Sequence, residues 1–208
     1  MMKRFTREHL DSLDYIFKIN LVNSLSGYKS ANLIGSISLE SIENVAVFSS
    51  VVHLGSTPPL FGFILRPTTV PRNTYENIKN TGYFTINHVS KSMIEDAHHT
   101  SAKYSSLISE FEVTDLTCEY LDDFIAPFVA ESPVKIAMKY VEELLIPYNQ
   151  TKMIIGEVQF LEVKKEMMQS DGFLNLSRGE VATINGLDGY AVPKLFKRLA
   201  YQRPKECI

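Results

Sequence analysis

The sequence predicts a mainly β fold, an antiparallel barrel with inserted helices, and three observations support this fold class. Short segments with two-residue alternation, or with many β-branched and aromatic residues, recur along the chain. The helical patterns between them are few and do not alternate regularly with the strands, as they would in a parallel sheet. No G-x-G-x-x-G motif follows a strand, so a Rossmann-type dinucleotide site is not expected. We therefore expect a closed or nearly closed antiparallel barrel.

Each expected strand is short and bounded by turn residues. In the segment that begins at Val134, alternate apolar residues share one face while Lys135 and Lys139 lie on the other, which is typical of a half-buried antiparallel strand. The expected strands are Phe17–Asn23, Val45–Val52, Leu60–Leu65, Tyr83–Val89, Val134–Val141 and Met153–Val163.

The expected helices carry recognisable end signals. In TYENIKNTG, Thr74 can cap the first N–H groups and Gly82 can adopt the left-handed conformation that ends a helix. A second helix is expected to begin at Ser92, whose spacing to Glu95 matches a capping box. A final helix is predicted over Lys194–Ala200, directly after a proline.

Composition limits the classes of partner. The 208 residues are 45% hydrophobic and 22% charged, as in globular proteins, and we expect one domain, residues 1–208, with short N- and C-terminal extensions. Lys plus Arg total 21 against 24 Asp plus Glu, so neither nucleic acid nor an anionic membrane is an expected partner. The apolar stretches are too short to cross a bilayer.

Cys118 and Cys207 form no disulfide or zinc pattern, and no secretory signal is evident, which favours the cytoplasm.

A series of motifs in a fixed order is the most informative feature. From Ser30 onwards the chain reads SANLIGSIS, FSSVVHLGSTPPLFGFILRP and RNTYENIKNTGYFTINHV, followed by HHTSAKYSSLISEF, ESPVKIAMKY, IIGEV and NGLDGY. This order resembles the flavin reductase-like family, and the likeness covers nearly the whole chain. The resemblance implies an FMN-binding split β-barrel of Greek-key type, and a homodimer with flavin near the subunit boundary. It also implies an oxidoreductase that takes a hydride from NADH or NADPH and passes electrons to free flavin or a redox protein.

Two small-residue segments are the predicted walls of the flavin ring slot. An isoalloxazine ring needs a flat, mainly apolar slot in which backbone groups meet its polar edge, and small residues allow the chain to approach closely. From the residues alone, an ordinary position in strands of the barrel core remains the alternative. The first wall comprises Ala31, Asn32, Leu33 and Ser36, and the second comprises Ser49, Ser50, Val51 and Val52.

The predicted phosphate end of the flavin site lies just beyond these walls. Arg66 is the preferred phosphate ligand, and Arg72 and Thr74 follow it at the start of a helix, where free N–H groups attract anions. The resemblance also places His98 and Ser101 near the cofactor. The alternative for Thr74 is a helix cap alone, and for each arginine a solvated loop charge.

The sequence predicts neither a catalytic side chain nor a metal site. No nucleophile motif is present, and the adjacent pair His98 and His99 lacks the spacing of a helical metal site. For His9, His53 and His88, a plain surface or core position is expected. Hydride transfer from nicotinamide to flavin needs no protein acid or base. Two alternatives stay open: a flavoredoxin-like electron-transfer protein that is reduced by a partner, and a barrel that binds no cofactor.

Overall fold

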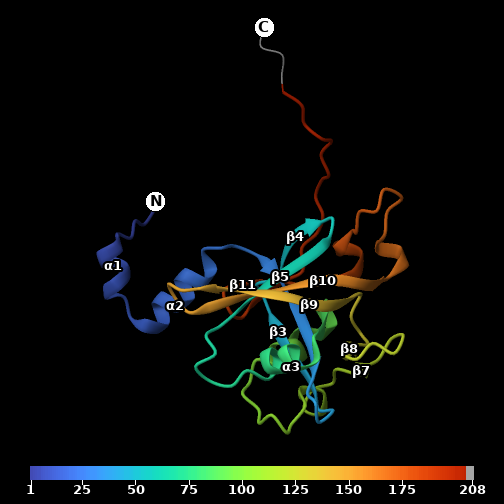
Figure 1. Cartoon of the computed structure of the whole chain (residues 1–208). Helices are drawn as coiled ribbons and strands as arrows, with labels where there is room; N and C mark the ends of the chain where they lie inside the picture. The colour runs from blue at the N-terminus through green and yellow to red at the C-terminus, as the bar shows by residue number, and fades with distance from the viewer. Residues whose placement is uncertain (205–208) are drawn as a thin grey trace.

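The computed structural model describes residues 1–204, and its centre is one seven-stranded antiparallel sheet that curls around a core (Figure 1). The strand order is β3-β2-β6-β9-β10-β5-β4. The bounds are β2 (Asn32–Ile37), β3 (Glu43–Phe48), β4 (Val52–Ser56), β5 (Pro59–Leu65), β6 (Tyr83–His88), β9 (Val134–Ile146) and β10 (Thr151–Val163). This mainly antiparallel architecture with few helices confirms the predicted fold class.

Two smaller sheets and several helices surround the main sheet. One small sheet has the order β1-β11-β12, and the other pairs β7 with β8. Their bounds are β1 (Lys29–Ser30), β11 (Thr183–Asn185), β12 (Gly189–Ala191), β7 (Cys118–Glu119) and β8 (Phe128–Val129). The α-helices are α1 (Arg7–Ser12), α2 (Tyr15–Ser24), α3 (Asn73–Thr81) and α4 (Ile94–His99). Short 3-10 helices cover Lys91–Met93, Glu110–Glu112, Lys165–Met167 and Leu176–Gly179.

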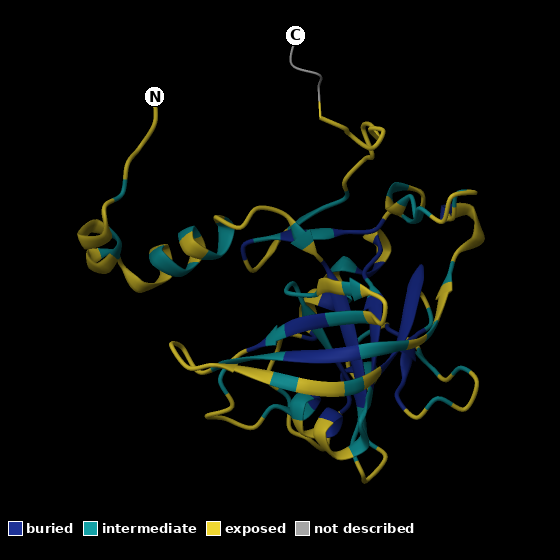
Figure 2. Cartoon of the chain, turned by 45° about the horizontal axis from the view of Figure 1, so that its top comes forward, coloured by how far each residue is buried: buried dark blue, intermediate teal, exposed yellow. Residues whose placement is uncertain are grey.

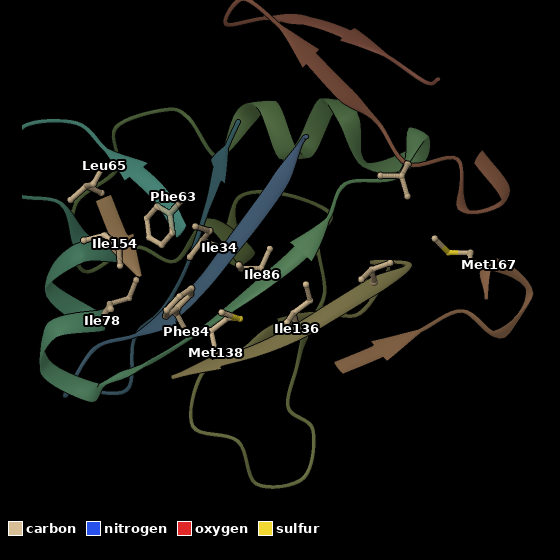
Figure 3. Packing of buried hydrophobic residues seen from close by; sticks show 12 residues of the cluster. Ile34, Phe63, Leu65, Ile78, Phe84, Ile86, Ile136, Met138, Ile154 and Met167 are labelled. Atoms are coloured by element: carbon tan, nitrogen blue, oxygen red, sulfur yellow. The ribbon is translucent and has the colours of Figure 1, made fainter. Parts of the chain in front are cut away.

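The core lies on the concave face of the main sheet, where inward side chains of facing strands meet (Figure 3). Ile34 of β2 lies directly opposite Ile86 of β6, and both are almost completely buried. Phe63 and Phe84 pack edge to face with their ring centroids 5.7 Å apart. Gly156 of β10 makes room for Phe84, because a Cβ atom there would lie 2.7 Å from the phenyl Cζ. This packing fixes the register of the strands that reach the site.

The two ends of the chain differ from the sequence prediction. The predicted strand Phe17–Asn23 is wrong, because this segment belongs to the helix α2: the Asp14 carboxylate accepts hydrogen bonds from the N–H groups of Ile16 and Phe17 and caps it. Both N-terminal helices lie to one side of the barrel and bury no residue (Figures 1 and 2). The predicted helix Lys194–Ala200 is also wrong, since this segment has no regular structure.

Side-chain hydrogen bonds hold the start of this C-terminal segment in place. The Ser177 hydroxyl accepts a hydrogen bond from the N–H of Leu195 and donates one to the carbonyl of Pro193. Cys207, for which the sequence predicted neither a disulfide nor a zinc site, lies outside the described residues.

The predicted helix starts are wrong, although Gly82 ends α3 with φ of +77° as expected. Helix α3 begins at Asn73, so Thr74 lies inside the helix and is not its cap; the Thr74 hydroxyl accepts a hydrogen bond from Asn44. The expected capping box at Ser92 is absent as well: a 3-10 turn precedes α4, and the Ser92 hydroxyl is bonded to that of Ser90.

Two strand details also differ from the prediction. The expected strand Val45–Val52 is broken at Ser49 into the end of β3 and the start of β4. Lys135, expected on a solvent-exposed face, is only 8% exposed and forms an ion pair with Glu119 of β7. Its partner strand covers that face of β9, whereas Lys139 is exposed as predicted.

Candidate functional site

Two polar residues lie face to face at one end of the barrel interior. Asn32 of β2 lies directly opposite His88 of β6. This pair is two residues along each strand from the buried pair Ile34 and Ile86, and it lies on the same inward face. The Asn32 side chain donates to the Ser30 hydroxyl at 2.8 Å, but its Oδ1 is buried without a hydrogen-bond partner. The Nδ1 atom of His88 is likewise buried and unpaired. Because unpaired buried polar atoms are rare, this pair marks a candidate binding site.

The segment after β3 forms a second wall beside this pair. The Ser50 hydroxyl accepts from the N–H of Ile64 at 3.0 Å and donates to the Ile64 carbonyl at 3.1 Å, so the segment is held on β5. The Ser30 hydroxyl donates to the carbonyl of Val51 at 3.4 Å while it accepts from Asn32. Ser30 thus joins the two segments that the sequence predicted as walls of a ring slot.

Two of the predicted anion-binding residues, Arg66 and Ser101, are exposed next to segments that are bonded to β5 and β3. Arg66 follows β5 directly, two residues after Ile64, and is exposed. It takes part in no ion pair with the described part of the chain. The Thr100 hydroxyl accepts from the N–H of Val47 at 2.9 Å, so the end of α4 is held on β3 and Ser101 is exposed beside it.

The His98 side chain contacts the small sheet β1-β11-β12. Its Nδ1 lies 3.3 Å from the hydroxyl of Tyr190 in β12, and the two rings pack edge to face. Burial, with a smaller contribution from Asp188, raises the pKa of Tyr190 to about 12. Tyr190 therefore stays protonated and can donate a hydrogen bond to His98 at neutral pH.

Other predicted site residues lie apart from this end. Ser36 is buried at the far end of β2 and Thr74 is buried in the first turn of α3, and asparagine side chains donate to both hydroxyls. Four residues of β-strand separate Ser36 from Asn32, which corresponds to about 13 Å. Leu33 points to the opposite face and is completely buried in the second apolar cluster. Val52 is 43% exposed in β4, on the outer side of the second wall.

A cavity of about 500 Å³ adjoins the Asn32–His88 pair. Ser30, Ala31 and His88 line it from the barrel side, and C-terminal segments form the other wall. Burial lowers the pKa of His88 to about 4, so its imidazole is neutral at neutral pH. Sequence reasoning gave His88 no functional role. The sequence could have indicated its orientation, because Phe84, Ile86 and His88 follow one another at two-residue spacing, which places His88 on the inward face of the strand.

Metal ligands and membrane-spanning helices are two further features that bear on function. Residues 1–204 contain no group of three metal-ligating side chains. In the same range, no helix is both long enough and apolar enough to cross a membrane.

Comparisons with known proteins show the family and the fold of the chain. Residues 29–185 match the family described as flavin reductase like domain. A candidate flavin reductase with a split barrel domain from Shewanella frigidimarina has a crystal structure that superimposes with a TM-score of 0.93 and is 46% identical, covering 97% of this chain and 100% of its own.

Two more distant relatives share parts of the chain. A protein of Aquifex aeolicus with no assigned function is 26% identical over 165 residues, which is 78% of this chain and 82% of its own. The flavoredoxin of Desulfovibrio vulgaris superimposes with a TM-score of 0.73 at 22% identity, covering 84% of this chain and 92% of its own. This last likeness shows a shared fold.

Proposed function

Since the chain belongs to the flavin reductase-like family, we propose that it binds FMN at the Asn32 end of the barrel and acts as an NAD(P)H-dependent flavin reductase. The observation that carries this proposal is the meeting of the two walls through Ser30, next to the unpaired Oδ1 of Asn32. A ring with a polar edge fits such a place, because it can offer an N–H group to an oxygen that the protein leaves unpaired.

The residues present fit the chemistry of FMN. Asn32 and the segment Ser49–Val51 would hold the ring edge, while Arg66 and Ser101 would bind the phosphate through a guanidinium group and a hydroxyl group. His98, positioned by Tyr190, stands beside Ser101 as a further polar contact. When bound, FMN supplies the redox chemistry by accepting a hydride from nicotinamide.

The protein's own contribution is binding, orientation and exclusion of water. Ser50 holds the second wall on β5, and Thr100 holds the end of α4 on β3, so the groups that would face the cofactor are fixed before it binds. No side chain is assigned as a catalytic acid or base. Ser36 and Thr74 would act at a distance, by fixing α3 against the strands.

Replacement of Arg66 tests the proposed phosphate contact. The Arg66→Ala variant is expected to bind FMN about 10- to 100-fold more weakly but riboflavin almost unchanged, because only FMN has a phosphate. Fluorescence titration with both flavins measures this difference. Arg7→Ala is the matched control, since Arg7 is an exposed arginine of α1 that pairs with Asp11. Equal losses for both flavins would contradict the phosphate assignment.

An electron-transfer protein without nicotinamide oxidation is the second candidate function, and the structural likeness to a flavoredoxin favours it. Anaerobic mixing of the flavin-loaded protein with NADH or NADPH separates the two. Rapid bleaching of the flavin absorbance supports the reductase, whereas oxidised flavin that persists with both nucleotides supports reduction by a partner protein.

We further propose a homodimer in the cytoplasm. Helix α2 buries no residue, and it exposes Tyr15, Ile16 and Val22 by 50% or more. An isolated helix of ten residues is marginal in water, so a second subunit that covers this face would stabilise it. The free thiol of Cys118 is compatible with a reducing compartment. Sedimentation of wild type and Ile16→Asp tests the dimer: a monomeric variant supports the role of α2, and a monomeric wild type refutes the dimer.

A further inference from the structure

The cavity beside His88 has a mainly apolar lining and two different walls. The barrel end and the small sheet form one wall, and the segments before and after β11 and β12 form the other. Its volume of about 500 Å³ is within the range of pockets that hold small molecules. The apolar residues of the lining include Ala31, Phe173, Leu176, Val181 and Phe196.

Few polar groups are free to meet a ligand in this cavity. The imidazole of His88 lines the cavity and forms no hydrogen bond with the described part of the chain, and a neutral imidazole carries one donor and one acceptor nitrogen. The ammonium of Lys29 already donates to the carbonyls of Asn23 and Gly186, both at 3.2 Å. The lining contains no carboxylate. A ligand would therefore find the His88 ring on the barrel side of a mainly apolar lining.

An irregular C-terminal segment, residues 193–198, covers the cavity, and we call it the C-terminal strap. Ser177 holds its start through hydrogen bonds with Pro193 and Leu195. Arg198 holds its end: the guanidinium donates to Gln169 at 2.7 Å and to Asp171 at 2.6 Å, and it stacks on the Phe173 ring at 4.1 Å. A cover fixed at two points and without regular structure can open locally at small cost.

We propose that this cavity binds a small, uncharged aromatic molecule with one hydroxyl or carbonyl group, which His88 orients, under the C-terminal strap. The apolar lining accounts for the aromatic body, and the imidazole of His88, which has no hydrogen-bond partner in the described part of the chain, accounts for the single polar group. Charge is disfavoured, because the imidazole is neutral, the Lys29 ammonium is already bonded to carbonyls, and Lys194, the other lysine of the lining, is an exposed residue of the strap. This inference does not depend on flavin binding.

Calorimetric titration with 4-ethylphenol, ethylbenzene and 4-ethylbenzoate tests the ligand class. The wild type is expected to bind 4-ethylphenol at least about tenfold more tightly than ethylbenzene, because only the phenol can pair with His88. In His88→Phe this preference should vanish while ethylbenzene still binds. His53→Phe is the matched control, since His53 is an exposed histidine of β4. An unchanged preference in His88→Phe, or tighter binding of 4-ethylbenzoate, would overturn the proposal.

A competition experiment separates this cavity from the flavin slot. Saturating FMN should leave 4-ethylphenol bound; displacement would show that the cavity is part of the flavin slot and would overturn a separate site. If the protein binds no FMN, the phenol titration still decides the present proposal, so the two failures are distinguishable. Retained folding of each variant is checked by its thermal unfolding without ligand.

The role of the strap is tested by the rates of binding. Arg198→Ala removes the contact that holds the end of the strap, so 4-ethylphenol should associate and dissociate at least about threefold faster in stopped-flow measurements, with a nearly unchanged Kd. Arg203→Ala, further along the tail, should leave both rates unchanged. Unchanged rates in Arg198→Ala would show that the strap does not cover the route to the cavity.

Discussion

Two clusters of polar side chains meet the inward face of β2, one around Ser36 and the other around Asn32, four residues apart, and they differ in one respect. At one end, Ser36 accepts hydrogen bonds from Asn44 and Asn77, and Asn44 also donates to Thr74. None of these side chains has a buried unpaired polar atom. At the other end, Asn32 and His88 each have one. The first cluster therefore holds the protein together, whereas the second has atoms to offer a ligand.

The difference shows how much hydrogen-bond accounting adds to residue type. A buried polar group without a partner costs free energy, and that cost is recovered only if a ligand or an ordered water pairs with it. The second cluster also borders the cavity and the two walls of the proposed flavin slot. Stability and binding should thus respond in opposite ways to changes at the two ends.

The largest expected effect concerns the pH dependence of stability. The pKa of His88 is about 4 in the folded protein and about 6.5 when unfolded, so at pH 7 the ring is neutral in both states. As the pH falls from about 6.5 towards 4, only the unfolded chain takes up this proton, and folding loses stability. The difference between the two pKa values lowers the free energy of unfolding by up to about 3 kcal/mol at pH 4.

Urea unfolding at pH 7 and pH 4 measures this contribution. Between these values the free energy of unfolding of wild type should fall by up to about 3 kcal/mol more than that of His88→Phe. His53→Phe serves as the matched control, because His53 is an exposed histidine of β4. Equal pH dependence in wild type and His88→Phe would mean that His88 takes up its proton normally in the fold.

A second prediction concerns the paired cluster. Asn44→Ala removes the donor that serves both Ser36 and Thr74, and it leaves those buried hydroxyls short of a partner. The free energy of unfolding should fall by about 2 kcal/mol, because lost hydrogen bonds in a buried site cost about 1–3 kcal/mol. The FMN affinity of the folded variant should be unchanged. A large loss of flavin affinity would show that this cluster belongs to the cofactor site.

The parts of the fold that could be predicted are those in which the local sequence pattern determines the secondary structure. The strands β5, β6 and β10 follow from alternation and β-branched content, and Gly82 ends α3 because its positive φ favours glycine. The sequence pattern gave a wrong strand at residues 17–23, because the apolar residues there suit a strand or a helix equally well. The helix is instead indicated by its N-terminal cap, Asp14, which lies just before the predicted segment.

The site was less predictable, because residue type does not reveal which hydrogen bonds are already made. Ser36 and Thr74 are hydroxyl residues in the right motifs, yet asparagines distant in sequence donate to both. His88 looked ordinary, and only the cross-strand register places it beside Asn32 at the mouth of a cavity. Such pairings depend on tertiary contacts that a single sequence does not display.

The smallest effect on stability is expected at Asn32, and it completes the comparison with Asn44. Asn32→Ala removes one hydrogen bond, to Ser30, together with an oxygen that has no partner, so the free energy of unfolding should change by about 1 kcal/mol or less. FMN affinity should nevertheless fall about tenfold, because the ring edge loses its acceptor. Urea unfolding and flavin titration of both alanine variants measure the two effects side by side. A loss of stability at Asn32 as large as that at Asn44, with flavin affinity intact, would mean that the unpaired oxygen serves the fold and not a ligand.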